Sequence, residues 1–327
     1  MCSGAAPTTA TTSLPATRLP EPAAGAPAAP RSGRPRTRRV DAWTANAWHW
    51  EDERTSGGAR QPVLTIFLAG AECPFHCVFC DLWRQTLDGP TPPGAIPAQI
   101  EKVLAEAGPL PRDAAVKLYN ASNFFDDRAV PPQDDEAIAG LVAPFARVVV
   151  ESHPRLVGPR CDGLAARLDG RLEVAMGLET AHPGALARLG KAMTLDDFDR
   201  AASRLAAGSA ALRVFLLVPP PFVPRADVLA WVARSAAHAR ACGAAHISMI
   251  PLRDDARTEA DLTLVEDALD HGADAAPACV VTVDLWDIDR LATCARCGPA
   301  RVARLRTWNL TGRAAPRVAC PTCTSPS

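Results

Sequence analysis

The chain has 327 residues and a mass of 34.5 kDa, which is enough for one large domain with appended segments. Its composition, 48% hydrophobic and 22% charged, is typical of globular proteins and excludes a wholly disordered, collagen-like or membrane-embedded chain. No apolar run approaches the ~18 residues of a membrane-spanning helix, so no membrane partner is expected. The formal net charge of −1 gives no global field that would attract nucleic acid.

Residues 1–40 are rich in Ala, Pro and Arg. Such a stretch cannot bury enough surface to offset its ordering entropy, so we expect a disordered tail. It faintly resembles an organelle transit peptide. It has no charged start followed by an apolar core, so no secretory signal is indicated and the chain is expected in the cytoplasm. The segment that follows, residues 41–56, contains three Trp and is interpreted as a lead-in that packs onto the main domain.

Short apolar runs alternate with amphipathic stretches from residue 62 onward. The runs are β-branched or apolar throughout, as strands buried on both faces are. The predicted strands are Val63–Ala69, Ala115–Tyr119, Arg147–Val150, Leu172–Gly177, Leu212–Val218, His246–Ile250 and Val280–Leu285. Repeated βα units imply a parallel sheet with right-handed crossovers. We therefore expect residues 41–290 to form a partial (β/α)6-type TIM barrel, with an open doubly wound sheet as the alternative and functional residues at the strands' carboxyl ends.

Helix boundaries are also visible between the predicted strands. Thr194-Leu-Asp-Asp197 resembles a capping box, and the helix it begins is expected to stop at Gly208. A second helix follows Pro224 and runs to Gly243. A third covers residues 261–270 and stops near residue 272. After about residue 290 this rhythm ends, which indicates a separate small module.

Three cysteines lie close together directly after the first predicted strand, in Ala71-Glu-Cys73-Pro-Phe-His-Cys77-Val-Phe-Cys80. Three thiols within eight residues can converge on one inorganic cluster. A four-iron cluster usually takes four thiolates, so three would leave one iron free to bind a small molecule. A zinc knuckle that uses His76 as the fourth ligand, or unrelated packing cysteines, are the alternatives.

The spacing Cys-x3-Cys-x2-Cys, with Phe79 just before the last Cys, resembles the radical S-adenosylmethionine (SAM) superfamily. The resemblance implies that Cys73, Cys77 and Cys80 bind a [4Fe-4S] cluster and that SAM chelates its open iron. It further implies that an electron, supplied by a reductase or flavodoxin-type donor, cleaves SAM to methionine and a 5′-deoxyadenosyl radical that abstracts hydrogen from a substrate. Phe79 is then expected beside the adenine.

Later motifs match this superfamily in part. The Gly-Gly-Glu motif that many members carry after the second strand is absent, and Asn120 and Ser122 are the polar residues at that place. Val150-Glu151-Ser-His-Pro and Gly177-Leu-Glu179-Thr resemble turns of the Elp3-type group, which makes Glu151 and Glu179 candidates for binding SAM; a structural ion pair is the alternative for both carboxylates. The order of these motifs and the trailing cysteines resembles the archaeosine-biosynthesis branch of the superfamily.

Residues 291–327 contain two Cys-x2-Cys pairs, Cys294/Cys297 and Cys320/Cys323. This pattern predicts a tetrahedral metal site in a zinc-ribbon-like module, with zinc favoured and an auxiliary iron–sulfur cluster as the alternative. Six Arg and no acidic residue accompany these cysteines, and Trp308 lies among them. Cations and an aromatic ring can bind RNA phosphates and bases, so an RNA-contacting face is one interpretation and a solvated basic surface is the other. The chain as a whole strongly prefers Arg to Lys, which weakens the first.

Together these patterns favour a radical SAM enzyme that acts on a tRNA or modified nucleoside. A small-molecule substrate in natural-product or cofactor biosynthesis is the first alternative. An iron–sulfur redox sensor that binds nucleic acid is the second.

Overall fold

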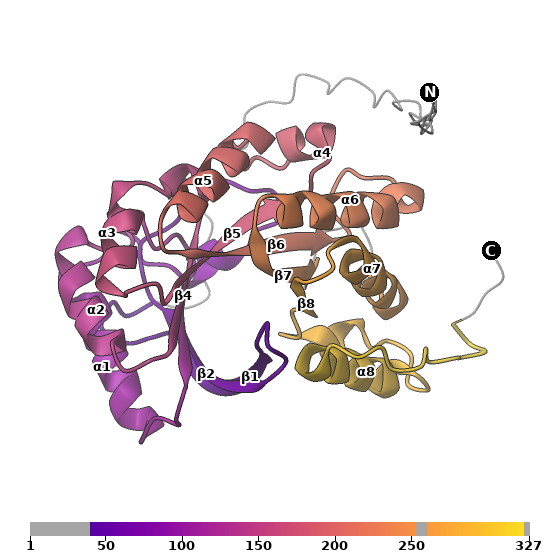
Figure 1. Cartoon of the computed structure of the whole chain (residues 1–327), viewed down its shortest axis with the longest axis horizontal. Helices are drawn as coiled ribbons and strands as arrows, with labels where there is room; N and C mark the ends of the chain where they lie inside the picture. The colour runs from indigo at the N-terminus through magenta and orange to yellow at the C-terminus, as the bar shows by residue number, and fades with distance from the viewer. Residues whose placement is uncertain (1–39, 253–259, 324–327) are drawn as a thin grey trace, which may run out of the picture. The chain divides into compact units, whose positions relative to one another are not determined.

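One curved sheet of eight strands organises the described part of the chain, residues 40–252 and 260–323 of a computed structural model (Figure 1). The predicted disordered tail lies outside these residues except for its last position. The strands follow one another in space in chain order: β1 (Ala47–Arg54), β2 (Arg60–Leu68), β3 (Ala115–Asn120), β4 (Arg147–Ser152), β5 (Leu172–Glu179), β6 (Ala211–Val218), β7 (Ala244–Pro251) and β8 (Val280–Val283). All pairs from β2 to β8 are parallel.

This arrangement confirms the α/β partial barrel, and all seven predicted strands are present as β2 to β8. Alternate residues of each strand point to opposite faces of the sheet. On β2, for example, Leu64, Ile66 and Leu68 are fully buried in the core that the outer helices cover, whereas Thr65 faces the concave side. The concave side is the lumen of the half-barrel.

Seven helices cover the convex face of the sheet in the described residues (Figure 1). They are α1 (Ala95–Ala107), α2 (Asp135–Val142), α3 (Pro159–Arg167), α4 (Pro183–Arg188), α5 (Leu195–Ala207), α6 (Val228–Ala241) and α7 (Leu262–Ala275). An eighth helix, α8 (Gly298–Thr311), lies at the edge of the sheet, and 3-10 turns occur at Leu82–Gln85, Pro132–Asp134, Pro154–Leu156, Arg225–Asp227 and Ile288–Leu291. The capping box that Thr194 and Asp197 were predicted to form is present at the start of α5. Helix α7 extends a few residues beyond its expected end.

Strand β1 is the one strand that the sequence analysis missed, since residues 41–56 were interpreted only as a packed lead-in. It pairs antiparallel with β2, so the sheet gains an edge strand before its parallel part begins. The sequence AWHWEDER alternates with period two. Trp48 and Trp50 pack against the hydrophobic core. Glu51 and Glu53 occupy the alternate positions of the strand and reach into the lumen. Charged residues on an inward face obscured the strand signal.

The amino-terminal end of the lumen is closed by a network of buried charges that includes Glu51, Glu53, Lys117, Arg147, Glu173 and Arg213. Arg213 is 1% exposed and lies 2.6 Å from Glu173 and 2.9 Å from Glu53. Burial disfavours the charge of Glu173, but Arg213 and Arg147 outweigh it and lower its pKa to about 2. Three cations and three carboxylates therefore form a neutral floor, to which β1 contributes two of the carboxylates.

His246 adjoins this floor, and its Nε2 lies 2.8 Å from the hydroxyl of Thr282. Burial and the nearby Arg213 lower the pKa of His246 to about 3, so it is neutral in the folded protein. The unfolded chain binds a proton there near pH 6.5, so folding stability should fall by about 1.4 kcal/mol per pH unit as pH drops from about 6.5 toward 3. Urea titrations across this range should show that His246→Gln reduces the slope by that amount. An unchanged slope would contradict a buried neutral His246.

Helix α8 covers the open edge of the sheet beside β8 and also contacts β1 (Figure 1). The amide of Asn309 accepts a hydrogen bond from the N–H of Val283 and donates one to its carbonyl, at 2.9 and 2.7 Å. The indole N–H of Trp308 donates to the carbonyl of Val281. An edge strand with free backbone groups invites aggregation, and α8 satisfies these groups with side chains.

Candidate functional site

The three clustered cysteines lie where the sequence predicted, in the loop that follows β2 at the carboxyl ends of the parallel strands. Cys77 is buried, and Cys73 and Cys80 are half-buried. Burial raises the pKa of Cys77 to about 12 and also raises the pKa of Cys73, so both are neutral thiols until a metal replaces the proton. The side chain of Phe79 is half-buried and packs against the hydrophobic core.

Contacts from two neighbouring segments hold this cysteine loop. The ring of Phe75 stacks on His153, which follows β4, with centroids 3.7 Å apart. The N–H of Val78 donates to the carbonyl of Leu189 at 2.9 Å. The loop is therefore anchored to the segments that follow β4 and α4, which fixes the cysteines relative to the lumen.

Asn123 links Cys73 to this framework. Its amide oxygen accepts the backbone N–H of His153 at 2.7 Å, and its Nδ2 therefore faces the sulfur of Cys73, at 3.1 Å. His153 in turn lies 2.9 Å from the carbonyl of Lys191. Because that carbonyl only accepts, Nε2 of His153 carries the proton, and its Nδ1 accepts the N–H of Arg155. Asn123 and His153 were not singled out as site residues from the sequence, because their roles arise from contacts with distant segments.

Gly190 lets the cysteine loop approach the loop that follows α4. Its φ is +69°, and a Cβ built on it would lie 2.7 Å from the backbone oxygen of His76. Gly190→Ala should therefore displace the cysteine loop and greatly reduce iron binding. Gly243→Ala is the matched control, because Gly243 has φ +87° but open space around its Cβ position. Both variants should lose about 1–2 kcal/mol of stability from the left-handed backbone. Equal iron content in the two variants would contradict this role of Gly190.

The irregular end of strand β5 sets the position of the Glu179 side chain. The register of β5 with β6 shifts between Gly177 and Glu179, and Glu179 has a φ of +66°. Its carboxylate pairs with Lys191 at 2.8 Å, and both side chains are under 10% exposed. A Cβ on Gly177 would overlap this pair. Positive φ in a non-glycine residue is costly and concentrates at functional sites.

Glu151, at the end of β4, accepts the backbone N–H of Asn120 at 2.8 Å. Burial raises its pKa to about 8, although that hydrogen bond and Lys191 oppose the shift. The Nδ2 of Asn120 and the Oγ of Ser122 are buried and have no hydrogen-bond partner within the described part of the chain. Buried polar groups of this kind cost free energy unless they meet a ligand. The structure thus brings Asn120, Ser122 and Glu151 together.

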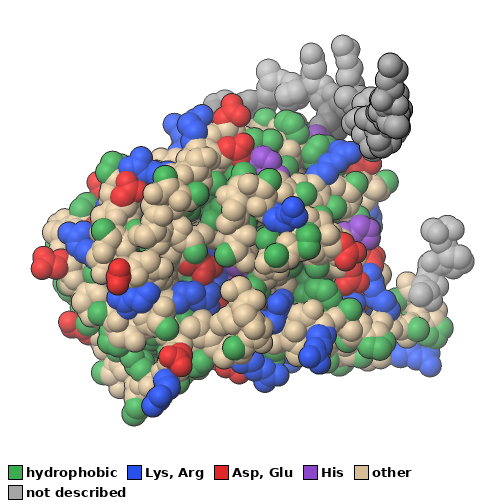
Figure 2. All heavy atoms as spheres, viewed as in Figure 1, with side chains coloured by type: hydrophobic (Ala, Val, Ile, Leu, Met, Phe, Trp, Pro, Cys, Tyr) green, Lys and Arg blue, Asp and Glu red, His purple; other side chains and the backbone are tan. Residues whose placement is uncertain are grey.

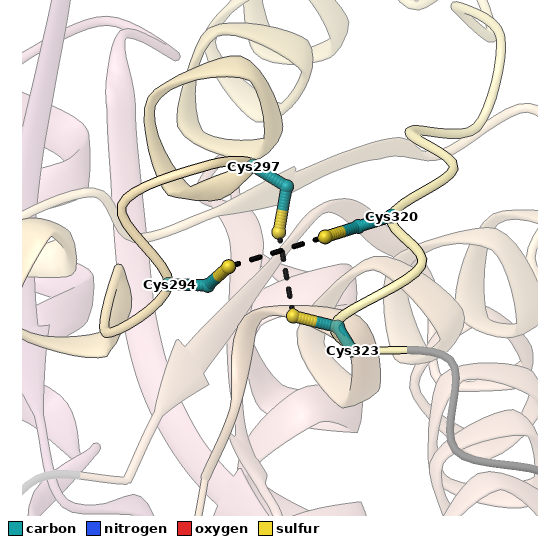
Figure 3. Close-up of side chains that lie close together, drawn as sticks. All are labelled: Cys294, Cys297, Cys320 and Cys323. Carbon is teal, nitrogen blue, oxygen red and sulfur yellow. Dashed lines mark hydrogen bonds between the residues drawn. The ribbon is translucent and has the colours of Figure 1, made fainter.

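The four C-terminal cysteines converge as predicted (Figure 3). Their sulfurs all lie within 4.8 Å of one another, with Cys294 and Cys320 4.0 Å apart and Cys297 and Cys323 3.5 Å apart. Four thiolates at a Zn–S distance of 2.3 Å in a tetrahedron are separated by about 3.8 Å. The geometry therefore suits a single tetrahedral ion.

The interval between the two cysteine pairs differs from the expected ribbon loop, because helix α8 occupies it. Three of the six arginines in residues 291–327 face α7. Arg301 and Arg304 are each 5% exposed and pair with Glu266, which is fully buried, and Arg317 pairs with Asp267 and Asp270. Arg301 also donates to the sulfur of Cys297 at 3.4 Å. Arg301, Arg304 and the half-buried Trp308 are packing residues, so these three do not belong to the RNA-contacting face that the sequence suggested. Arg296, Arg306, Arg313 and Arg317 are exposed.

No helix in the described residues is both long and apolar enough to cross a membrane. No family model matches the chain. It is 25% identical over 198 residues to archaeosine synthase subunit beta of Methanosarcina acetivorans, covering 57% of this chain and 56% of that protein. It is 30% identical over 134 residues to archaeosine synthase subunit beta of Thermococcus kodakarensis, covering 39% of this chain and 40% of that protein. The chain thus spans about half the length of the curated relatives it matches.

The crystal structure of Streptococcus suis SuiB is similar in fold, with a TM-score of 0.52 and 11% identity over 68% of this chain and 49% of that one. SuiB has also been solved bound to S-adenosylmethionine. The predicted fold is confirmed: the chain forms a half-barrel similar to that of SuiB, and its sequence is similar to archaeosine synthase subunit beta.

Proposed function

We propose that this protein is a radical SAM enzyme. The observation that carries the proposal is the position of the three-cysteine loop at the carboxyl ends of a half-barrel, beside buried polar groups that have no hydrogen-bond partner among the described residues. When bound, a [4Fe-4S] cluster and SAM supply a 5′-deoxyadenosyl radical that abstracts hydrogen from the substrate. The donor set fits this pair of cofactors, because three thiols suit three irons and the fourth iron stays open for SAM.

The chain's own residues hold and orient these groups. Cys73, Cys77 and Cys80 are the cluster ligands, and the amide of Asn123 donates to the sulfur of Cys73. The carboxyl groups of Glu151 and Glu179, with Nδ2 of Asn120 and Oγ of Ser122, would bind the charged and ribose groups of SAM. Phe79 would lie beside the adenine. The charged floor closes the far end of the lumen.

The test is anaerobic reconstitution followed by reduction in the presence of SAM. Wild-type protein should bind four irons in the loop cluster and release 5′-deoxyadenosine. Cys77→Ala should abolish both, because the cluster loses one of three ligands. Cys161→Ala, which changes a buried cysteine of α3 remote from the loop, should leave both intact. SAM cleavage by the Cys77→Ala protein would overturn the proposal, and so would the absence of cleavage by the wild type.

We further propose a tRNA or modified nucleoside as the substrate, supported by the name of the curated relatives. Figure 2 shows acidic and basic side chains interspersed on one face of the molecule. This face therefore gives little support for RNA binding, because acidic side chains repel the phosphates. If tRNA is the substrate, it should stimulate 5′-deoxyadenosine formation. If only small molecules do so, the natural-product or cofactor alternative is correct. A redox sensor would cleave no SAM.

The remaining partners follow from the same proposal. A cytoplasmic reductase or flavodoxin-type protein would deliver the electron. We propose zinc for the four C-terminal cysteines, because a cubane cluster binds each thiolate at a different iron and so spaces its ligands more widely than a single ion does. The proposed domain division, residues 41–290 for the half-barrel and 291–327 for the metal module, places the boundary just before Cys294.

A further inference from the structure

A second group of metal-ligating side chains lies between helices α5 and α6, on the convex side of the sheet. Asp199 comes from α5, His238 from α6, and Cys242 from the end of α6. His238 Nε2 and Cys242 Sγ lie 2.7 and 3.4 Å from the same oxygen, Oδ1 of Asp199. The three ligand atoms all lie within 4.8 Å of one another, a property shared in the described residues by the C-terminal cysteines.

The backbone holds these ligands in place. Residues four apart on a helix lie on the same face, so His238 and Cys242 point the same way. The N–H of Cys242 donates to the carbonyl of His238 at 3.0 Å, which continues the helical geometry through Cys242. Phe198, the neighbour of Asp199, packs on the imidazole with centroids 6.2 Å apart. The site therefore needs little rearrangement to bind an ion.

The charge at this position is also unbalanced. In the portion of the chain that the structure describes, Asp199 has no Lys or Arg within 4.0 Å, and His238 is its recorded ion-pair partner. The side chains of Asp199 and His238 are 44% and 28% exposed, which leaves a path from solvent.

We propose that Asp199, His238 and Cys242 form a binding site for a divalent transition metal, best matched by Zn²⁺, that bridges α5 and α6. Carboxylate oxygen, imidazole nitrogen and thiolate sulfur are the three zinc ligand types, and three protein ligands leave a fourth position for water. On binding, the S–H bond of Cys242 breaks, a metal–sulfur bond forms and the proton passes to solvent. His238 binds through Nε2 and keeps its proton on Nδ1. No redox step is involved, and the site is independent of the proposed SAM chemistry.

The test measures zinc in the full-length protein after equilibration with micromolar free zinc and removal of the excess. Cys242→Ser and His238→Gln should each contain one zinc per chain fewer than the wild type. Cys161→Ser is the matched control, because it removes a buried thiol of α3 that belongs to neither group of metal-ligating side chains in the described residues, and it should keep the wild-type content. Zinc should also raise the melting temperature of the wild type more than that of either variant.

Two variants keep the test decisive if one folds poorly. Circular dichroism identifies a misfolded variant. His238→Gln is the milder change, because the His238 side chain is partly exposed. Zinc content equal to the wild type in folded His238→Gln protein would overturn the proposal. Cobalt-substituted wild type and cobalt-substituted Cys242→Ser protein should also differ in thiolate charge-transfer absorption, and identical spectra would overturn it. A Cys294→Ser variant should lose the zinc bound by the C-terminal cysteines and keep the one zinc per chain bound between α5 and α6. That result would separate this site from the C-terminal one.

Discussion

Glu53→Ala should lower the free energy of unfolding by about 3–5 kcal/mol, because it leaves buried cations without their partner. The Glu53 side chain is 12% exposed and pairs with Lys117, Arg147 and Arg213 at 2.6 to 2.9 Å. Removing it leaves three cations against two carboxylates on the floor of the lumen. Urea titration monitored by circular dichroism measures the change.

Asp52→Ala is the matched control for this prediction. Asp52 is the adjacent residue of β1 and is exposed, so its loss should change stability by no more than about 0.5 kcal/mol. Glu53→Gln should give an intermediate loss, since it keeps a hydrogen-bond acceptor without the charge. If Glu53→Ala and Asp52→Ala unfold at the same urea concentration, the charged network on the floor of the lumen does not stabilise the fold.

Cys297→Ser should remove the C-terminal metal and release helix α8 from the half-barrel. Structural zinc contributes about 10–16 kcal/mol of apparent binding energy in small zinc-binding peptides, so metal and local folding are coupled. The effect extends to α7, because Arg301 donates to Cys297 and pairs with the buried Glu266. Hydrogen exchange should show loss of protection across residues 298–311 and in α7.

Metal analysis identifies the ion in the same experiment. A variant with Cys73, Cys77 and Cys80 all changed to Ala removes the loop cluster. After equilibration with a chelator that strips weakly held zinc, it should retain one zinc per chain, and adding Cys297→Ser should remove it. Cys279→Ser changes a half-buried cysteine outside the group and serves as the control. Four residual irons with sulfide would contradict the assignment of zinc and establish an auxiliary cluster.

Local signals in the sequence determined much of this protein. Apolar runs of strand length identified β2 to β8, since a strand buried on both faces needs no distant information to be recognised. Thr194 and Asp197 marked the start of α5 because a capping box involves residues only three apart. The two cysteine groups were recognised in the same way, because metal ligands that are close in sequence have characteristic spacings.

The tertiary structure decided how distant segments combine. Strand β1 was hidden because its inward carboxylates make sense only opposite Arg213, 160 residues away from Glu53. Asn123 and Gly190 became functional candidates only when the segments after β3 and α4 met the cysteine loop. The arginines near Trp308 looked free to bind RNA, since their sequence neighbours include no acid. Folding placed Glu266 of α7 against Arg301 and Arg304, because a buried charge is tolerated only beside an opposite one, and sequence spacing carries no record of that partner.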